Sequence, residues 1–290
     1  MTKSEFSIII PALNEQELLP RLLDNLASQT LSGLQIIVVD ANSSDDTVKV
    51  AKKYSSLLNL KLISTSIRNV SYQRNLGAKH AQADWIMFFD ADNQISTTFF
   101  QKLTHQLTQK PTDFFTTFIA PDSDNSKDQF ICSLWNLSAL ATASVNQPHA
   151  FGACIGVKKS VFIQSTGFDK SVKYQEDQEF VERLKELGFK FSLFPKPQLI
   201  YSFRRFRKEG RLKLIRKTAH LHFRNLFDGF DSRKDPTLYP MLGGAFYQES
   251  SSTKTTPTVK QLNQTLESLT RSQLAKLENF IKIITSDKHS

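Results

Sequence analysis

The stretch Trp85-Ile86-Met87-Phe88-Phe89-Asp90-Ala91-Asp92 places a run of large apolar residues directly before two carboxylates. A short apolar run of this kind is typical of a strand that is buried on both faces, and the acids mark its end. Such strands belong to parallel sheets, in which ligands collect at the carboxyl ends of the strands. We therefore expect Asp90 and Asp92 to lie at a ligand-binding edge of the sheet.

The same alternation of apolar runs and helical patterns extends through the first hundred residues. Residues 6–10 form a β-branched run that stops at Pro11, and residues 34–39 form a second run that ends at Asp40. Leucines spaced on one face predict a helix over residues 15–28. The other expected elements are strands at 60–64, 114–119, 154–157, 189–194 and 198–201 and helices at 70–81, 130–145 and 177–187. This order predicts an α/β fold with a mainly parallel sheet and helices on both of its faces.

The formal net charge of +9 comes mostly from one segment. Nine basic residues and one acid lie within residues 203–224, and the rest of the chain is nearly neutral. Three interpretations of this segment stay open: a solvated helix face, a basic amphipathic helix on anionic lipid, and phosphate binding by the guanidinium groups of Arg204 and Arg205. RNA binding is disfavoured because no aromatic stacking motif accompanies the charge, and we expect no nucleic-acid partner.

The sequence is that of a folded protein, with 40% hydrophobic and 22% charged residues. It has no uncharged apolar run of the ~18 residues that a membrane span needs, and we find no secretory signal at its N-terminus. Cys132 and Cys154 stand in apolar surroundings and are expected to be reduced, buried thiols. These features predict a cytoplasmic protein, with the basic segment allowing peripheral attachment to the cytoplasmic face of a membrane.

The chain is expected to comprise three parts. Residues 1–225 form the α/β domain, 226–258 an irregular region that ends in a Ser/Thr-rich linker, and 259–285 an amphipathic helix for docking or homodimerisation.

Two groups of acids could carry chemistry, and each has a structural alternative. Asp90 and Asp92 fit a Mg²⁺ or Mn²⁺ ion on a diphosphate, or an Asp-rich turn before a helix. Asp40 is either a turn residue or an acceptor for a ribose hydroxyl or a base. Glu176 and Asp177 either stabilise the dipole of the helix they begin, or supply a general base.

With these pieces in order, the chain resembles the family 2 glycosyltransferases of the GT-A fold over roughly residues 5–190. The resemblance is carried by the order and spacing of short motifs. These are Ile8-Ile9-Ile10-Pro11-Ala12-Leu13-Asn14-Glu15, Val38-Val39-Asp40-Ala41-Asn42-Ser43-Ser44-Asp45-Asp46-Thr47, Arg74-Asn75-Leu76-Gly77-Ala78, Phe88-Phe89-Asp90-Ala91-Asp92, Gly167-Phe168-Asp169 and Glu176-Asp177-Gln178-Glu179.

The resemblance implies transfer of a sugar from a nucleotide-diphosphate donor, and it assigns roles to residues. Those expected at the nucleotide are Pro11, Ala12, Leu13, Glu15, Asp40, Arg74 and Asp90. Asp92, together with Asp90, would hold the metal, and Asp177 would accept the proton of the acceptor hydroxyl. Arg204 and Arg205 match an Arg-Arg pair that some members carry for the diphosphate, and Glu176 is expected with them at the phosphate or the acceptor.

The processive members of this family carry a Q-x-x-R-W motif after the base. Residues 201–206 lack its Gln and its Trp, which argues against a processive polymerase. The function predicted is thus a metal-dependent, non-processive, inverting hexosyl transfer to a glycan or lipid-linked hydroxyl. Two alternatives stay open: a polyprenyl-phosphate acceptor, which needs no base, and a non-catalytic nucleotide-sugar-binding or scaffold protein with the same fold.

Overall fold

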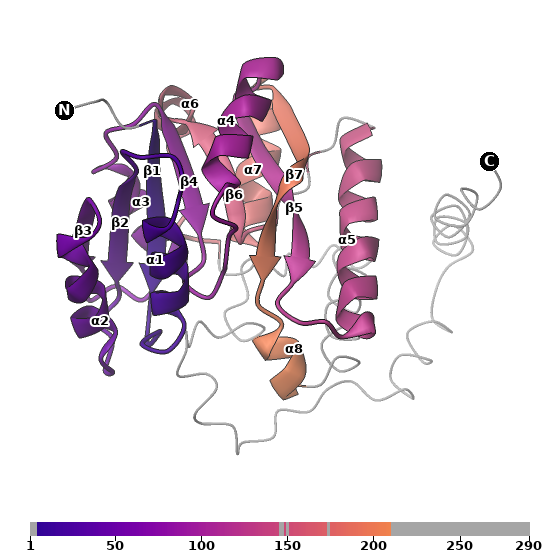
Figure 1. Ribbon diagram of the computed structural model, residues 1–290. Helices are drawn as coiled ribbons and strands as arrows, with labels where there is room; N and C mark the ends of the chain where they lie inside the picture. The colour runs from indigo at the N-terminus through magenta and orange to yellow at the C-terminus, as the bar shows by residue number, and fades with distance from the viewer. Residues whose placement is uncertain (1–4, 145–147, 149–150, 173–174, 210–290) are drawn as a thin grey trace, which may run out of the picture. The chain divides into compact units, whose positions relative to one another are not determined.

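Seven strands form one sheet within the part of the chain that the computed structural model describes, which is residues 5–144, 148, 151–172 and 175–209 (Figure 1). The strands are β1 (Phe6–Ala12), β2 (Gln35–Asp40), β3 (Leu60–Ser64), β4 (Trp85–Phe89), β5 (Phe114–Pro121), β6 (Cys154–Lys158) and β7 (Phe191–Tyr201). The α-helices are α1 (Leu19–Ala27), α2 (Thr47–Lys53), α3 (Val70–Ala78), α4 (Phe99–Gln109), α5 (Ser126–Ser144), α6 (Lys159–Gln164), α7 (Glu176–Glu186) and α8 (Arg204–Glu209), with a short 3₁₀ helix at Tyr54–Ser56. The predicted α/β fold is confirmed.

The strand order β3-β2-β1-β4-β6-β5-β7 puts the first strand near the middle of the sheet. The chain builds outward from β1 through β2 to β3, then returns to place β4 on the other side of β1. Between β1 and β4 the direction of building reverses, and crevices for ligands form at such switch points. The ends of β1 and β4 lead into residues 13–15 and 90–92, so both predicted motifs flank this crevice.

β6 runs antiparallel to both of its neighbours, β4 and β5. The other pairs are parallel, so the sheet is mixed but mainly parallel. Because β6 is reversed, its first residue, Cys154, pairs with Phe89 at the edge where β4 ends. The segment before β6 therefore reaches the crevice as well.

Helices cover both faces of the sheet, α1, α2 and α4 in front and α3, α6 and α7 behind in Figure 1. The rear core packs aliphatic strand residues against aromatic rings from α6 and α7, including Phe162 and Phe180, which are nearly inaccessible to solvent. Gly77 lets α3 approach β1 closely, because a Cβ at this position would stand 2.5 Å from Cγ2 of Ile9. This close approach brings the polar residues of α3 to the edge of the sheet.

β7 is one strand of 11 residues, although the sequence predicts two short strands here. Pro195 and Pro197 interrupt the apolar pattern and caused the error. β7 is the outermost strand beside β5, and proline is tolerated in outer strands and at bulges because it needs no partner for an N–H. The pairing indeed shifts register between Thr117 and Ile119 of β5.

α5 buries only one side of an apolar helix. Cys132, Asn136 and Ala139 face the protein, and Asn136 bonds both the N–H and the C=O of Ile119 in β5. The outer side is lined by large apolar residues that are about half exposed or more, namely Phe130, Leu134, Leu137 and Leu140. The apolar pattern of residues 130–145 predicts a helix in a core or at an interface, and the inner side of α5 is buried in the protein.

The chain up to Arg205 belongs to one compact unit, and Phe206 begins another, of which residues 206–209 are described. The predicted boundary at 225, the linker and the helix at 259–285 fall outside the described residues, as does the basic segment beyond 209. No helix among the described residues is long and apolar enough to cross a bilayer.

Candidate active site

Two arginines and five acidic side chains lie near the switch point between β1 and β4. Arg74 lies in α3 and contacts Asp90 and Glu176, and Arg204 begins α8 and contacts Glu15 and Asp92. The fifth acid, Asp177, follows Glu176 at the start of α7. The sequence predicted all seven side chains as site residues, but it did not predict how they pair.

Arg74 is the buried centre of this arrangement, with 3% of its side chain exposed. Its Nη1 donates to Oε1 of Glu176 at 2.9 Å, and its Nη2 donates to Oδ1 of Asp90 at 3.1 Å and to the C=O of Gly152 at 3.3 Å. The guanidinium carbon also stands 5.1 Å from the ring centroid of Phe168. Arg74 therefore ties together the end of β4, the start of α7 and the segment before β6.

Burial alone would lower the pKa of Arg74, but the nearby carboxylates of Glu176 and Asp90 more than offset this and raise it. The residue thus stays charged. A buried cation of this kind needs paired anions, which Glu176 and Asp90 supply.

Arg204 forms a fork with Glu15 at the opposite side of the site. Nη1 donates to Oε2 of Glu15 at 2.9 Å and Nη2 donates to Oε1 at 2.7 Å, which is the two-point geometry that guanidinium and carboxylate favour. Nε of the same guanidinium lies 3.1 Å from Oδ2 of Asp92. Arg205 follows in α8 and is half-buried.

Burial raises the pKa of both acids that follow β4. The pKa of Asp90 rises to about 6, because desolvation outweighs the attraction of Arg74, and Asp92 and Glu176 add repulsion. The side chain of Asp90 is 39% exposed, so solvent screens part of this effect. The pKa of Asp92 also rises to about 6 through burial, which Arg204 opposes and Glu15 reinforces. Burial thus disfavours the charged form of both carboxylates, and an added cation would favour it.

Asp177 combines a raised pKa with a tightly fitted position. Burial raises its pKa to about 7, Glu176 adds repulsion, and Arg74 opposes the shift. A Cβ on Gly152 would stand 2.2 Å from Oδ2 of Asp177, so only a glycine leaves room for the carboxylate here. An acid whose pKa lies near neutral pH is suited to accept a proton.

The part of the site beside β1 and β2 is held by hydrogen bonds between two loops. After β1, the N–H of Asn14 donates to Oγ of Ser43 at 2.8 Å, and the N–H of Glu15 donates to Oγ1 of Thr47 at 2.7 Å. Asp40, at the end of β2, accepts from the N–H and the hydroxyl of Ser43. Asp40 is thus a turn residue, as one interpretation predicted, while a role toward a base stays a prediction.

Pro11 and Ala12 are the last two residues of β1, and Leu13 follows in the loop. Pro11 and Leu13 are partly exposed, whereas Ala12 is 2% exposed. The C=O of Ala12 accepts hydrogen bonds from the N–H of Ala41 and from Gln73 of α3. This part of β1 is therefore fixed on both sides.

The site fits a divalent cation that is shared with phosphate oxygens. Among the described residues no cluster of three or more His, Cys, Asp or Glu is arranged as a metal site by itself. Mg²⁺ is commonly held by one or two carboxylates plus substrate phosphates and water, and Asp90 and Asp92 meet this requirement. Their raised pKa values agree with a place for positive charge.

The sequence missed three residues that shape the site. Asn93 is inaccessible to solvent and donates from Nδ2 to the C=O of Ala153 at 2.7 Å, which holds the loop after β4 to the segment before β6. Ser202 hydrogen-bonds the carboxylate of Asp92. Gly152, which has no Cβ, leaves room for the carboxylate of Asp177. The adjacency of Asn93 to the acids was a usable signal, whereas Gly152 and Ser202 gave none.

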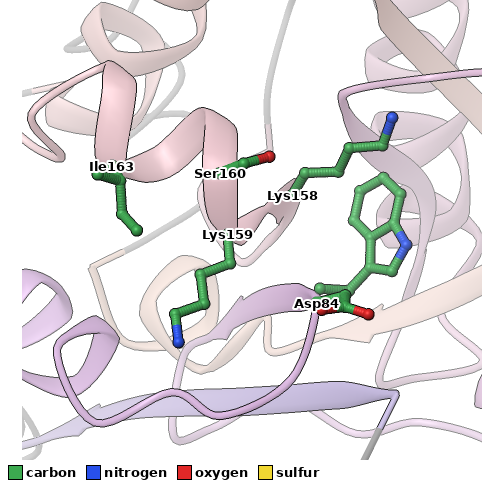
Figure 2. A pocket seen from close by; sticks show the side chains of 6 residues that line it. Asp84, Lys158, Lys159, Ser160 and Ile163 are labelled. Carbon is green, nitrogen blue, oxygen red and sulfur yellow. The ribbon is translucent and has the colours of Figure 1, made fainter.

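A cavity of about 410 Å³ lies at the other end of β4, where Trp85 pairs with Lys158 of β6 (Figure 2). Figure 2 shows the side chains of Lys158 and Lys159 pointing away from each other. Nζ of Lys158 donates to Asp113 at 2.9 Å, and Nζ of Lys159 donates to the C=O of Ala81 at 2.7 Å. Its cationic groups are thus bound within the protein, and we assign the cavity no role.

Comparison with known proteins identifies the family of the chain. Residues 7–165 match the family described as Glycosyl transferase family 2, which is more than half of the chain. The chain belongs to glycosyl transferase family 2.

Individual relatives that the chain resembles are named as glycosyltransferases. An uncharacterized glycosyltransferase of Haemophilus influenzae is 27% identical over 186 residues, covering 61% of each chain. The poly(ribitol-phosphate) beta-N-acetylglucosaminyltransferase TarS of Staphylococcus aureus is 32% identical over 96 residues, which is 32% of this chain and 17% of that protein. The chain thus spans less than two thirds of these relatives.

Solved structures share the fold. A mannosyltransferase of Pyrobaculum calidifontis in complex with GDP-Man and Mn²⁺ superposes with a TM-score of 0.62 and 17% identity, over 98% of this chain and 81% of that one. Residues 1–349 of S. aureus TarS in complex with UDP-GlcNAc superpose with a TM-score of 0.58 and 18% identity, over 82% of this chain and 70% of that one. These neighbours establish the GT-A-like fold.

Proposed function

We propose that this protein transfers a sugar from a nucleotide-diphosphate donor to an acceptor hydroxyl, in a metal-dependent, non-processive and inverting reaction. The observation that carries this proposal is that Asp90 and Asp92 follow β4 at the switch point of the sheet and that Asp177 lies near enough to Asp90 for the two carboxylates to repel each other. Family membership and the nucleotide-sugar complexes of two structural neighbours support it.

The donor half of the site consists of the loops after β1, β2 and β4. Pro11, Ala12, Leu13 and Glu15 border the nucleoside, and Asp40 holds the base. Arg74 acts from beneath this surface, because its guanidinium is buried and bound to Asp90 and Glu176. Its role toward the nucleotide is therefore to position carboxylates.

Asp92 and Asp90 would hold the Mg²⁺ or Mn²⁺ ion. When bound, the ion would screen the charge that develops on the leaving diphosphate. Arg204 and Arg205 would add positive charge for the diphosphate, and Arg204 is already oriented by Glu15. The leaving group would thus be stabilised by the metal and by guanidinium groups.

Asp177 accepts the proton of the acceptor hydroxyl. Its carboxylate is deprotonated above a pH of about 7, and Gly152, which has no Cβ, leaves room for its Oδ2. Removal of the proton makes the oxygen a better nucleophile for in-line attack at the anomeric carbon, and that direction of attack inverts the centre.

The acceptor is proposed to be a glycan or a lipid-linked sugar, and the transferred group a hexose. Residues 203–224 are proposed to contact an anionic membrane from the cytoplasmic side, and residues 259–285 to form a homodimer contact. Binding to liposomes of neutral and anionic composition at increasing salt tests the first point, because equal binding to both would refute an electrostatic contribution.

A donor screen by thermal shift tests the central proposal. Wild-type protein is heated with Mn²⁺ and each of several nucleotide sugars, and a bound donor at 100 times its Kd stabilises the fold by ~2.7 kcal/mol. We expect one donor to raise the Tm in the presence of Mn²⁺, and D92A to abolish both this rise and slow donor hydrolysis. The absence of a rise with every donor and metal would refute the proposal.

A further inference from the structure

Arg204 contacts two carboxylates, of which one is assigned to the metal and the other is not. These contacts support an inference that rests on the proposed function and goes beyond it. Its two terminal nitrogens bind Glu15, at 2.9 and 2.7 Å, and its Nε lies 3.1 Å from Oδ2 of Asp92. Asp92 is the residue assigned to the metal. A guanidinium therefore stands against the carboxylate that a cation must use.

We propose that Arg204 is a resident counter-ion of Asp92, which competes with the divalent cation and keeps metal affinity low until a nucleoside diphosphate draws the guanidinium away. Metal and nucleotide then bind together, and the metal alone binds weakly.

The charges of the site explain why a counter-ion is needed. Asp92 has 19% of its side chain exposed and lies near Glu15, whose side chain is 7% exposed. Two poorly solvated carboxylates repel each other and need a cation between them. Arg204 supplies one positive charge without metal, but it also repels a dication that approaches the same carboxylate.

The two arginines of the site differ in their freedom to move. Arg74 is 3% exposed and binds two carboxylates and a backbone carbonyl, so it is fixed. Arg204 is 23% exposed and touches Asp92 through Nε, while its fork on Glu15 uses other nitrogens. The contact with Asp92 is a single approach of Nε at 3.1 Å, whereas the fork on Glu15 consists of two hydrogen bonds at 2.9 and 2.7 Å. The contact with Asp92 is therefore the weaker of the two.

Glu15 gives this movement a fixed anchor. Its N–H donates to Oγ1 of Thr47 at 2.7 Å, and its C=O accepts from the N–H groups of Leu18 and Leu19. The Arg204 side chain can thus leave Asp92 for a diphosphate while its start in α8 and its acidic neighbour stay in place.

The test measures Mn²⁺ binding without nucleotide, by the loss of the electron paramagnetic resonance signal of free Mn²⁺. R204M removes the competitor, and we expect Mn²⁺ to bind at least roughly tenfold more tightly than to wild type, since removing an opposite charge beside a carboxylate changes its affinity for a cation by one or more powers of ten. The double variant E15Q/R204M keeps the net charge of wild type and leaves no unpaired acid at position 15, and it should show a gain of the same size.

Two controls identify the source of a gain. K158M removes a positive charge at the other end of β4 and should leave Mn²⁺ affinity as in wild type. Adding D92N to the double variant should cancel the gain. Thermal melts establish that each variant is folded, and if R204M alone fails to fold, the double variant decides.

Unchanged Mn²⁺ affinity in E15Q/R204M, or a gain that survives D92N, overturns the inference. So does wild-type protein that binds Mn²⁺ as tightly without nucleotide as the variants do. The thermal shift of wild type with donor and Mn²⁺ reports separately on the proposed function, so failure of the two can be told apart.

Discussion

Arg74 and Glu176 stand 102 positions apart in the chain, yet Nη1 of the first donates to Oε1 of the second at 2.9 Å inside the protein. This pair fixes the first turn of α7 against α3. The acids at the start of α7 suit the helix dipole, as the sequence predicted, but Glu176 is also the partner of a buried cation. The helix-dipole interpretation of this motif is thus met, Glu176 has a second role as an ion-pair partner, and the general base stays a prediction.

Replacing Arg74 by methionine should destabilise the fold strongly, because Glu176 and Asp90 lose their buried counter-ion. Breaking one partner of a buried pair costs about 3–5 kcal/mol. Urea unfolding of R74M measures this. K158M is the matched control, because the pair of Lys158 and Asp113 is more exposed, at 43% and 25%, and exposed pairs contribute about 0–1 kcal/mol. Equal losses in both variants would contradict the central role of Arg74.

Transfer should depend on the charge of Asp177. Because burial raises its pKa to about 7, the carboxylate is protonated in acid and the single-turnover rate should rise with pH until about 7 and then level off. D177N should still bind the donor but lose transfer. If D177N turns over as wild type does, Asp177 is not the base, and an acceptor that is already a nucleophile, such as a polyprenyl phosphate, becomes the better model.

The same carboxyl should make stability fall as pH rises. Its folded pKa of about 7 lies above the ordinary value of 3.8, so between these pH values the folded protein keeps a proton that the unfolded chain has released. Stability from this group is thus lost from about pH 4 to 7. We expect the Tm of D177N minus that of wild type to increase over this range, and a constant difference would argue against the raised pKa.

Substituting Gly152 by alanine should displace Asp177 without removing it, because the new Cβ meets Oδ2 of Asp177 at 2.2 Å. Misplacement of a catalytic group by ~1 Å can slow a reaction by about 100-fold. We expect a slower chemical step with donor Kd unchanged. G33A is the control, since alanine is strained at the positive φ of Gly33 (+82°) but its Cβ meets no atom within 4 Å, and it should lower the Tm and leave the chemical step of the folded enzyme intact.

Many residues of the proposed donor half could be predicted from the sequence, because the signal lies within a short stretch of the chain. An apolar run that ends in Asp40 or in Asp90 reveals both the strand and its polarity, and parallel strands then bring those ends to one edge. The switch point between β1 and β4 follows from the strand order, which the sequence did not reveal.

The pairing of charges could not be predicted, since it depends on contacts between distant segments. Glu15 and Arg204 are 189 positions apart, and no periodicity relates them. Gly152 and Asp177 meet because β6 is reversed in the sheet, and an apolar run shows the presence of a strand but not its direction. The sequence predicts Arg74 near the nucleotide, but its side chain is buried, and the sequence did not reveal this burial.

Because β6 is reversed, the segments around the site come from two different kinds of strand end. The loops after β1, β2 and β4 are strand exits, whereas Gly152 and Ala153 belong to a strand entry that arrives from α5. A change in length or composition of that entry alters the wall beside Asp177 while the three exits keep their lengths. Such a frame permits the wall beside Asp177 to change in evolution while the three strand exits stay the same.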